Sequence, residues 1–209
     1  MKGRLLFAIV PVKGLDVSKE RLSRVLNPEK RKALTAAMLR DILNALKSST
    51  IREVLVISPD SSLKQIADEY GFSFVLSNRV GLNPGLKEAI EWCTQKKADC
   101  VLILPADIPL VSPHDIDKVV ELGSERSTVV LCPSLDGGTN ALLLNPPDAI
   151  PVCFGPNSFY KHIKEALDKG VTIKFYSSRE MMLDVDAEED LIKLLEIGGN
   201  VISKQVLTK

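Results

Sequence analysis

The chain has 209 residues, of which 45% are hydrophobic, and this length suits one domain at the large end of the usual range. Its 27 Lys and Arg residues balance its 27 Asp and Glu residues, so the formal net charge is zero. A protein without a basic surplus is a poor candidate for a general nucleic-acid binder, although a locally basic pocket for one phosphorylated ligand remains compatible with this balance. We therefore expect a single domain over residues 1–209 that binds no nucleic acid.

The cysteines and the N-terminal segment predict an intracellular protein. No CxxC pair occurs, and no His stands at metal-site spacing from any of the four cysteines, Cys93, Cys100, Cys132 and Cys153. Three of them lie in or beside apolar runs, as buried free thiols do in a reducing compartment. The first apolar run, Leu5–Val10, is too short to span a membrane, and Pro11 follows it at once. We expect a buried strand there, in a cytoplasmic protein without a membrane partner.

Strands and helices are predicted to alternate along the chain. Apolar runs predict strands at Leu5–Val10, Val54–Ile57, Phe72–Leu76, Cys100–Leu104, Thr128–Cys132, Ala141–Leu144 and Val171–Tyr176. Cap residues, most of them beside a proline, predict helices that begin near Asn27, Ser62, Asn83, Ser112 and Asn157. Asp186 and Glu189 fit a capping box of a last helix, which Gly198 ends. The tail, residues 200–209, alternates weakly and fits an added edge strand.

This alternation predicts an α/β fold with a mostly parallel sheet and helices on both faces. Ligands of such sheets bind beyond the carboxyl ends of the strands. The loops after the first, fourth and sixth predicted strands are therefore the places where we look for chemistry.

The loop after the first strand is basic and carries Lys13, Lys19, Arg21 and Arg24. At the ligand edge these cations can hold a polyphosphate, Lys as a point charge and Arg as a fork. The alternative is an ordinary solvated loop. The sequence contains no GxxxxGK[ST] phosphate-binding loop and no double-glycine dinucleotide fingerprint.

Three aspartates fit a metal site. Asp107 directly follows a buried strand between two prolines, and a hard oxygen ligand there suits Mg²⁺. Asp184 and Asp186 stand two residues apart in a short extended segment, so both carboxylates face one side and repel each other unless a cation compensates them. The alternatives are a turn-forming role for Asp107 and a helix-capping role for Asp186.

Two glycine-containing segments fit an anion site. Gly137–Asn140 allows close approach of the backbone to a ligand, and Phe154–Ser158 leads into a helix N-terminus, where free N–H groups attract anions. A hairpin turn and simple helix capping explain the same segments. Asn83 is best explained as a helix cap, with a contact to a nucleotide as the second possibility. His114 and His162 look structural, because neither has a clear Ser or Cys partner for acyl transfer.

Taken together, the segments VPVKGLDVSKERLS, LPADIPL, DGGTNALLL, FGPNSFYKHIKEA and LDVDAEEDL resemble the 2-phospho-L-lactate guanylyltransferase (CofC) family of coenzyme F420 biosynthesis. The matches run in order from Pro11 to Leu191, and the GGTN and FGxxS segments are the most specific of them. The resemblance implies a nucleotide-diphospho-sugar transferase (GT-A-like) fold, a homodimer, and condensation of GTP with 2-phospho-L-lactate to lactyl-2-diphospho-5'-guanosine and pyrophosphate. Related enzymes use phosphoenolpyruvate or 3-phosphoglycerate instead.

The resemblance also implies roles for particular residues. Metal ligands would be Asp107, Asp184 and Asp186; ligands of the phosphorylated acid would be Thr139, Gly155 and Ser158; catalytic, phosphate-binding cations would be Lys13, Lys19 and Arg21. The family's basic loop often has a small residue where this chain has Glu20, a departure that concerns how the loop lies on the triphosphate.

The reaction fits these residues because a phosphate oxygen is already ionised near neutral pH and needs no general base. One rival is a nucleotide-sugar glycosyltransferase, for which the 5% aromatic content and the single Trp are low. The other rival is a non-catalytic nucleotide-binding protein, which would not need all three aspartates together with the basic loop.

Overall fold

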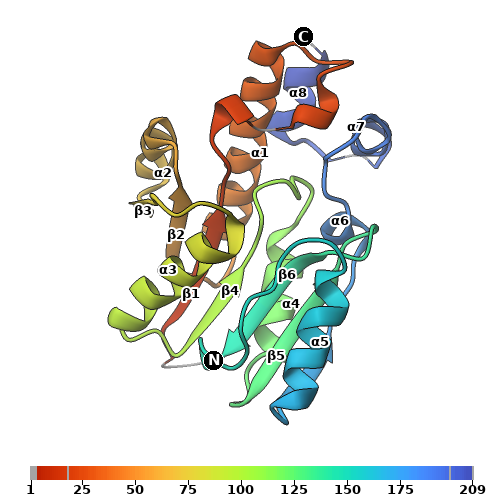
Figure 1. The fold of residues 1–209 in the computed structure, drawn as a ribbon. Helices are drawn as coiled ribbons and strands as arrows, with labels where there is room; N and C mark the ends of the chain where they lie inside the picture. The colour runs from red at the N-terminus through yellow and green to blue at the C-terminus, as the bar shows by residue number, and fades with distance from the viewer. Residues whose placement is uncertain (1–3, 18, 198, 209) are drawn as a thin grey trace.

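The computed structural model describes residues 4–17, 19–197 and 199–208. Within them a seven-stranded sheet forms the centre of the molecule (Figure 1). The strands are β1 (Leu6–Pro11), β2 (Glu53–Ser58), β3 (Ser73–Leu76), β4 (Cys100–Ile103), β5 (Thr128–Pro133), β6 (Thr139–Asn145) and β7 (Thr172–Phe175). Their order across the sheet is β3-β2-β1-β4-β6-β5-β7. All seven strands predicted from the apolar runs are therefore present.

The sheet is mostly parallel, as predicted. Only β6 is reversed, since it pairs antiparallel with both β4 and β5, whereas β1 pairs parallel with β2 and β4, and β5 pairs parallel with β7. The reversal corrects one expectation. The loop after the sixth strand starts at the opposite edge of the sheet, and it is the beginning of β6, at Thr139, that lies at the edge where β1 and β4 end.

Helices cover both faces of the sheet, which confirms the predicted fold class. They are α1 (Pro28–Ser48), α2 (Lys64–Tyr70), α3 (Leu82–Gln95), α4 (Pro113–Leu122), α5 (Ser158–Asp168), α6 (Arg179–Met182), α7 (Glu188–Glu196) and α8 (Ile202–Thr208), with the short 3-10 turns η1 (Leu15–Val17), η2 (Glu20–Leu22) and η3 (Ser61–Leu63). Alternate residues of β1 point to opposite faces. Ala8 and Val10 pack in the cluster that contains α1 and α4, and Phe7 and Ile9 pack in the cluster that contains α3 and α5.

Some predicted helix caps are confirmed and others are wrong, among them Ser62, which lies inside η3 and is itself capped by Asp60. Asn27 caps α1 through its side chain, and Ser112 caps α4 in a capping box. Asn83 caps nothing, because α3 already begins at Leu82 and Asn83 lies inside its first turn. Asp186 is not the cap of α7 either: that helix begins at Glu188, and the carboxylate of Asp190 accepts the N–H of Ala187.

The predicted edge strand over residues 200–209 is wrong, because the tail forms α8 instead. The carboxylate of Asp41, in the middle of α1, accepts hydrogen bonds from the free N–H groups of Ile202 and Ser203 at 2.7 and 2.9 Å. Apolar residues of η2, α1, α7 and α8 then form a third core cluster beside the sheet. A weakly alternating pattern cannot reveal this, because the acceptor that fixes the helix start comes from a distant part of the chain.

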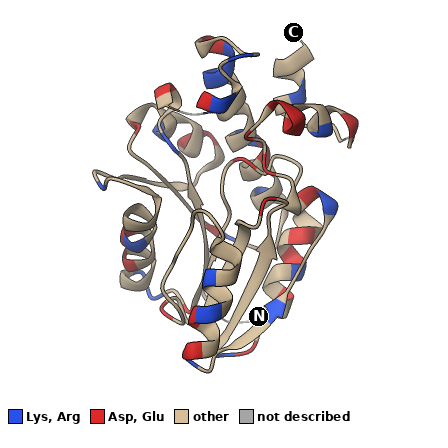
Figure 2. Ribbon diagram, turned by 45° about the vertical axis from the view of Figure 1, so that its right-hand side comes forward, with Lys and Arg blue, Asp and Glu red and all other residues tan. Residues whose placement is uncertain are grey.

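The cysteines are free, as predicted: Cys93, Cys100 and Cys132 are buried, and Cys153 is half-buried. Burial raises the pKa of each of the three buried thiols to about 12, so they stay protonated and unreactive. Within the described ranges, no helix combines the length and the apolar character that a bilayer crossing requires. Figure 2 shows basic and acidic residues interspersed along the outer helices, in keeping with the zero net charge.

Candidate functional site

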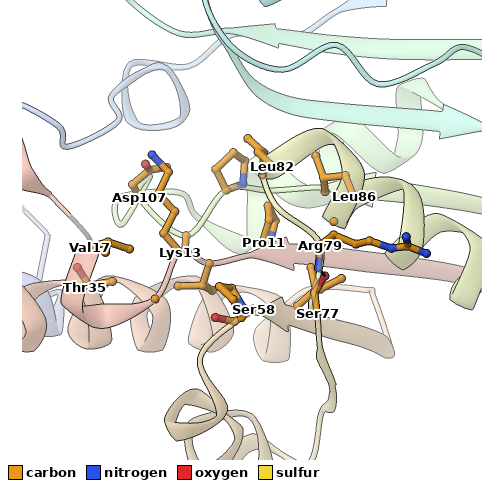
Figure 3. Close-up of a pocket in the computed structure, with 18 of the residues that line it drawn as sticks. Pro11, Lys13, Val17, Thr35, Ser58, Ser77, Arg79, Leu82, Leu86 and Asp107 are labelled. Carbon is orange, nitrogen blue, oxygen red and sulfur yellow. Dashed lines mark hydrogen bonds between the residues drawn. The ribbon is translucent and has the colours of Figure 1, made fainter.

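A cavity of about 360 Å³ opens at the carboxyl ends of the parallel strands. One end carries charged side chains from three separate loops: Lys13 and Lys19 follow β1, Asp107 follows β4, and Asp186 precedes α7. The remaining wall is largely apolar and includes Val12, Val17, Met38, Ile57, Leu82 and Leu86. Figure 3 shows Asp107 at one side of the cavity, with Ser77 and Arg79 at the other. A polar head and an apolar body in one cavity suit a ligand that combines phosphates with a flat ring.

Lys19 lies between two of the predicted carboxylates. Its Nζ is 2.9 Å from Asp107 and 2.6 Å from Asp186, and its side chain is only 7% exposed. Burial by itself would lower the pKa of Lys19, but the two carboxylates outweigh it and the pKa is raised, so the ammonium stays charged. The backbone of Lys19 is left-handed, with φ 53°, a conformation that costs a side-chain-bearing residue about 1–2 kcal/mol. Strain of this kind is typical of functional positions.

The third carboxylate, Asp184, lies in the same charged group. Burial first, and the nearby Asp107 second, raise the pKa of Asp184 to about 6. The backbone N–H of Val185 donates to the carbonyl of Asp107 at 2.9 Å, which ties the two acidic segments together. For Asp186, burial alone would raise the pKa, but Lys19 outweighs it and the pKa is lowered. The three predicted metal ligands are thus brought together, with a lysine ammonium between two of them.

The described part of the chain contains no group of three or more His, Cys, Asp or Glu residues that is arranged as a metal site as it stands. The chemistry of the donor set still fits a divalent cation. Hard carboxylate oxygens from Asp107, Asp184 and Asp186 are the ligands that Mg²⁺ prefers, and the negative charge of Asp107 contributes, after burial, to the raised pKa of Asp184. A second positive charge at this position would therefore be stabilised.

Two further predicted cations lie at the rim of the charged group. Lys13 is exposed and lines the cavity, and Arg21 is exposed on η2. Both lower the pKa of Asp186 through charge, so their positive ends act on the same carboxylate that Lys19 contacts. The positive charges of the predicted phosphate-binding loop therefore lie near the acidic segment.

The predicted acid-binding residues form a separate cluster at the beginning of β6 and α5. Thr139 Oγ1 lies 3.0 Å from Ser158 Oγ, and both side chains are buried. Gly155 turns the chain into α5 with φ 124°, a conformation that favours glycine. The backbone N–H of Ser158 already donates to the carbonyl of Gly155 at 3.0 Å, so this N–H is not free to bind an acid in this structure.

Asn83 does not line the cavity. Its amide donates to the carbonyl of Phe154 at 2.9 Å and accepts the N–H of the same residue at 2.8 Å, which fastens α3 to the segment before α5. The neighbouring cavity-lining positions are Gly81, Leu82, Gly85 and Leu86. A contact of Asn83 itself with a nucleotide, as predicted from the sequence, would require these two bonds to break.

Sequence reasoning missed two contributors to the site. Asn140 donates to the carbonyl of Met181 at 3.1 Å and to the carboxylate of Asp184 at 3.4 Å, so it anchors the acidic segment to β6. Arg79 follows β3 and adds a cation to the far side of the cavity. Asn140 could have been identified through the GGTN segment, whereas nothing in the sequence distinguishes Arg79 from other surface arginines.

His162, predicted to be structural, is fully buried. Burial, and to a smaller extent the neighbouring Lys161, lower the pKa of His162 to about 4. An unfolded histidine titrates near 6.5, so the unfolded chain takes up a proton between pH 6.5 and 4 that the folded chain does not. The stability that His162 contributes is therefore fully present above pH 6.5 and is lost as the pH falls towards 4.

We expect this loss to amount to about 3 kcal/mol of unfolding free energy. The measurement is urea unfolding of the wild type and of His162→Asn at pH 7.5 and at pH 4.5. The difference between the two proteins should shrink or reverse at the lower pH, since the variant lacks the titrating ring. An equal change in unfolding free energy for the two proteins between pH 7.5 and pH 4.5 would contradict the assignment of a neutral, buried His162.

The fold, together with the cluster of carboxylates and lysines at this cavity, is that of a nucleotidyltransferase. The family model described as "Guanylyl transferase CofC like" matches residues 6–209. The chain belongs to this family, which makes it a guanylyltransferase of coenzyme F420 biosynthesis. The family predicted from the sequence motifs is confirmed.

Two guanylyltransferases that are similar to this chain support this assignment. The chain is 40% identical over 194 residues to the phosphoenolpyruvate guanylyltransferase of Rubrobacter xylanophilus, covering 92% of this chain and 95% of the relative. It is 36% identical over 203 residues to the 2-phospho-L-lactate guanylyltransferase of Methanothermobacter thermautotrophicus, covering 97% and 89%.

Solved structures show the same fold. A protein from Desulfovibrio desulfuricans G20, described as a nucleotide-diphospho-sugar transferase, superposes with a TM-score of 0.82 at 17% identity, covering 98% of this chain and 94% of that one. A nucleotidyl transferase from Methanothermobacter superposes with a TM-score of 0.71 at 16% identity, covering 93% and 98%. The predicted nucleotide-diphospho-sugar transferase fold is confirmed.

Proposed function

We propose that this chain, acting as a single domain over residues 1–209, condenses GTP with 2-phospho-L-lactate and releases pyrophosphate. The observation that carries the proposal is the group of Asp107, Asp184 and Asp186 with Lys19, at a cavity of about 360 Å³ whose remaining wall is largely apolar. A phosphate oxygen of the acid attacks the α-phosphorus of GTP, the bond from this phosphorus to the bridging oxygen breaks, and pyrophosphate leaves. The product is lactyl-2-diphospho-5'-guanosine.

The second candidate for the acid is phosphoenolpyruvate. The relative from Rubrobacter xylanophilus, 40% identical to this chain over 194 residues, is a phosphoenolpyruvate guanylyltransferase. 3-Phosphoglycerate is a third candidate with the same chemistry. All three acids present a phosphate and a carboxylate on a short carbon skeleton, so the same charged site can serve them. Transfer of a sugar from a nucleotide sugar, the rival suggested by the fold, is disfavoured by the family assignment.

The three aspartates would hold Mg²⁺, which supplies positive charge that offsets the charge developing on the α-phosphate and the leaving pyrophosphate. Lys19 now occupies part of this acidic group, and we expect its ammonium to turn to the triphosphate when a divalent cation takes over the carboxylates. Lys13 lines the cavity, Arg21 acts on Asp186 through its charge, and both would hold the remaining phosphate charge.

The reaction needs no proton transfer, because the attacking phosphate is already ionised. What the chain must supply is position and charge. The apolar wall around Leu82 and Leu86 would receive the guanosine, and the cluster of Thr139, Gly155 and Ser158 would receive the phosphorylated acid. Neither histidine is required as a base.

We also propose a homodimer that works in the cytoplasm. The exposed side chains of Tyr160 on α5 and Phe175 on the edge strand β7 supply apolar surface that a second copy could cover. Light scattering on the purified chain gives the mass in solution, and a monomer at micromolar concentration would contradict the dimer.

We expect pyrophosphate release only when a nucleotide, an acid and Mg²⁺ are all present. The experiment pairs GTP, ATP, CTP and UTP with each of the three phosphorylated acids, with EDTA as the control for the metal. Turnover with GTP and 2-phospho-L-lactate supports the proposal in full. Turnover with GTP and another acid would change the identity of the acid substrate but keep the proposed reaction. No turnover with any pair, from folded protein supplied with Mg²⁺, would overturn the proposed function.

A further inference from the structure

A chain of three buried side chains lies behind the proposed acid subsite. His162 Nδ1 is 3.1 Å from Thr139 Oγ1, and Thr139 Oγ1 is 3.0 Å from Ser158 Oγ. On the other side of the ring, the backbone N–H of Cys153 donates to His162 Nε2 at 2.9 Å. The exposed fractions of Thr139, Ser158 and His162 are 5%, 1% and 0%.

The direction of these hydrogen bonds follows from the one group that can only donate. The N–H of Cys153 gives its proton to Nε2, so Nε2 is the accepting nitrogen of the ring. An imidazole that accepts at Nε2 carries its proton on Nδ1. Nδ1 therefore donates to Thr139 Oγ1. The ring is neutral over the physiological pH range because its burial opposes protonation.

The Thr139–Ser158 pair has one hydroxyl proton that its own hydrogen bond does not use. The hydroxyls of Thr139 and Ser158 carry two protons, and only one of these is used in the bond between the two oxygens. Neither hydroxyl has another side-chain or backbone partner among the described residues. A buried O–H without an acceptor is unfavourable, so an oxygen-rich ligand is favoured beside it.

We propose that His162 is a positioning residue of the acid subsite: by donating to Thr139 it commits the remaining hydroxyl proton of the Thr139–Ser158 pair to an oxygen of the phosphorylated acid. The inference rests on the proposed function and deepens it. Thr139 and Asn140 are adjacent in β6 and point to opposite faces, and Asn140 contacts Asp184. The first two residues of β6 thus link the acid subsite to the carboxylates.

The test compares two substitutions that each keep one half of the ring's bonding. The amide nitrogen of His162→Asn stands near the position of Nδ1 and can still donate to Thr139. The amide oxygen of His162→Gln reaches towards the position of Nε2, accepts the N–H of Cys153 and leaves Thr139 without its donor. We expect His162→Gln to raise the KM for the acid about 10-fold or more while the KM for GTP changes less than about 2-fold.

We expect His162→Asn to recover most of the lost acid affinity. Equal changes in both KM values, or equal behaviour of the two variants, would mean that the ring acts only through packing and would overturn the inference. If the Gln variant does not fold, Thr139→Val and Thr139→Ser replace it. The Val variant, which lacks the hydroxyl, should raise the KM for the acid, and the Ser variant, which keeps it, should recover most of the loss.

A measurement on the wild type tests the inference even without turnover. Nitrogen-15 NMR of the imidazole distinguishes a proton on Nδ1 from one on Nε2, and we expect the Nδ1–H form of His162 at pH 7. The Nε2–H form would overturn the inference whatever the kinetics. Wild-type protein that shows the Nδ1–H form but turns over no acid would contradict the proposed function and not the tautomer assigned to His162. The failure of the proposed function can therefore be told apart from the failure of the inference.

Discussion

Asp107→Ala should lower kcat by about 10²- to 10³-fold, the usual effect of removing one group that stabilises transition-state charge. Asp107 is the carboxylate that follows β4, and it contacts Lys19 at 2.9 Å. Its removal deprives the acidic group of one hard oxygen ligand and leaves Lys19 paired with Asp186 alone. The measurement is steady-state pyrophosphate release over a range of Mg²⁺ concentrations.

The substitution should leave the fold intact, because Lys19 keeps its ion pair with Asp186 and the backbone bond of Asp107 is retained. Its carbonyl accepts the N–H of Val185, and alanine retains that carbonyl. Asp168→Ala, at the exposed end of α5, is the matched control and should keep wild-type turnover. A folded Asp107→Ala protein with undiminished kcat would remove Asp107 from the metal site.

Lys19→Met should have two separable effects. Without divalent cations it leaves Asp107 and Asp186 without their ammonium, and breaking a fully buried pair of this kind costs about 3–5 kcal/mol. The two carboxylates are 30% and 45% exposed, so solvent screening reduces the loss in unfolding free energy to about 1–3 kcal/mol. Addition of Mg²⁺ should restore much of it, since the cation replaces the missing charge.

In turnover, Lys19→Met should raise the KM for GTP by about 10- to 100-fold, because a charge-assisted contact to the triphosphate is lost. Lys30→Met, an exposed lysine near the start of α1, is the control for removing one positive charge. Urea unfolding with EDTA and with Mg²⁺ measures the first effect, and initial rates measure the second. Unchanged stability together with an unchanged KM would contradict both roles of Lys19.

The sequence by itself determined the fold class and most of the elements. Continuous apolar runs of Val, Leu and Ile gave the strand positions because strands buried on both faces admit few other residues. Asn27 and Ser112 marked helix starts because capping is a local interaction between a side chain and N–H groups three residues away. The grouping of Asp107 with Asp184 and Asp186 followed from the carboxylate chemistry of a Mg²⁺ site and from the family resemblance.

Only the tertiary structure decided the features that depend on contacts between residues far apart in the sequence. The tail forms α8 because Asp41, far away in the sequence, accepts its first N–H groups. Lys19 became a buried counter-ion of two carboxylates because three loops meet at the edge of the sheet, and its sequence neighbours carry no sign of this. His162 lies on a helix face and acquired a bonding role only when β6, reversed in the sheet, brought Thr139 to it. Local patterns encode local hydrogen bonds and burial, whereas side-chain contacts between remote segments arise when the sheet assembles.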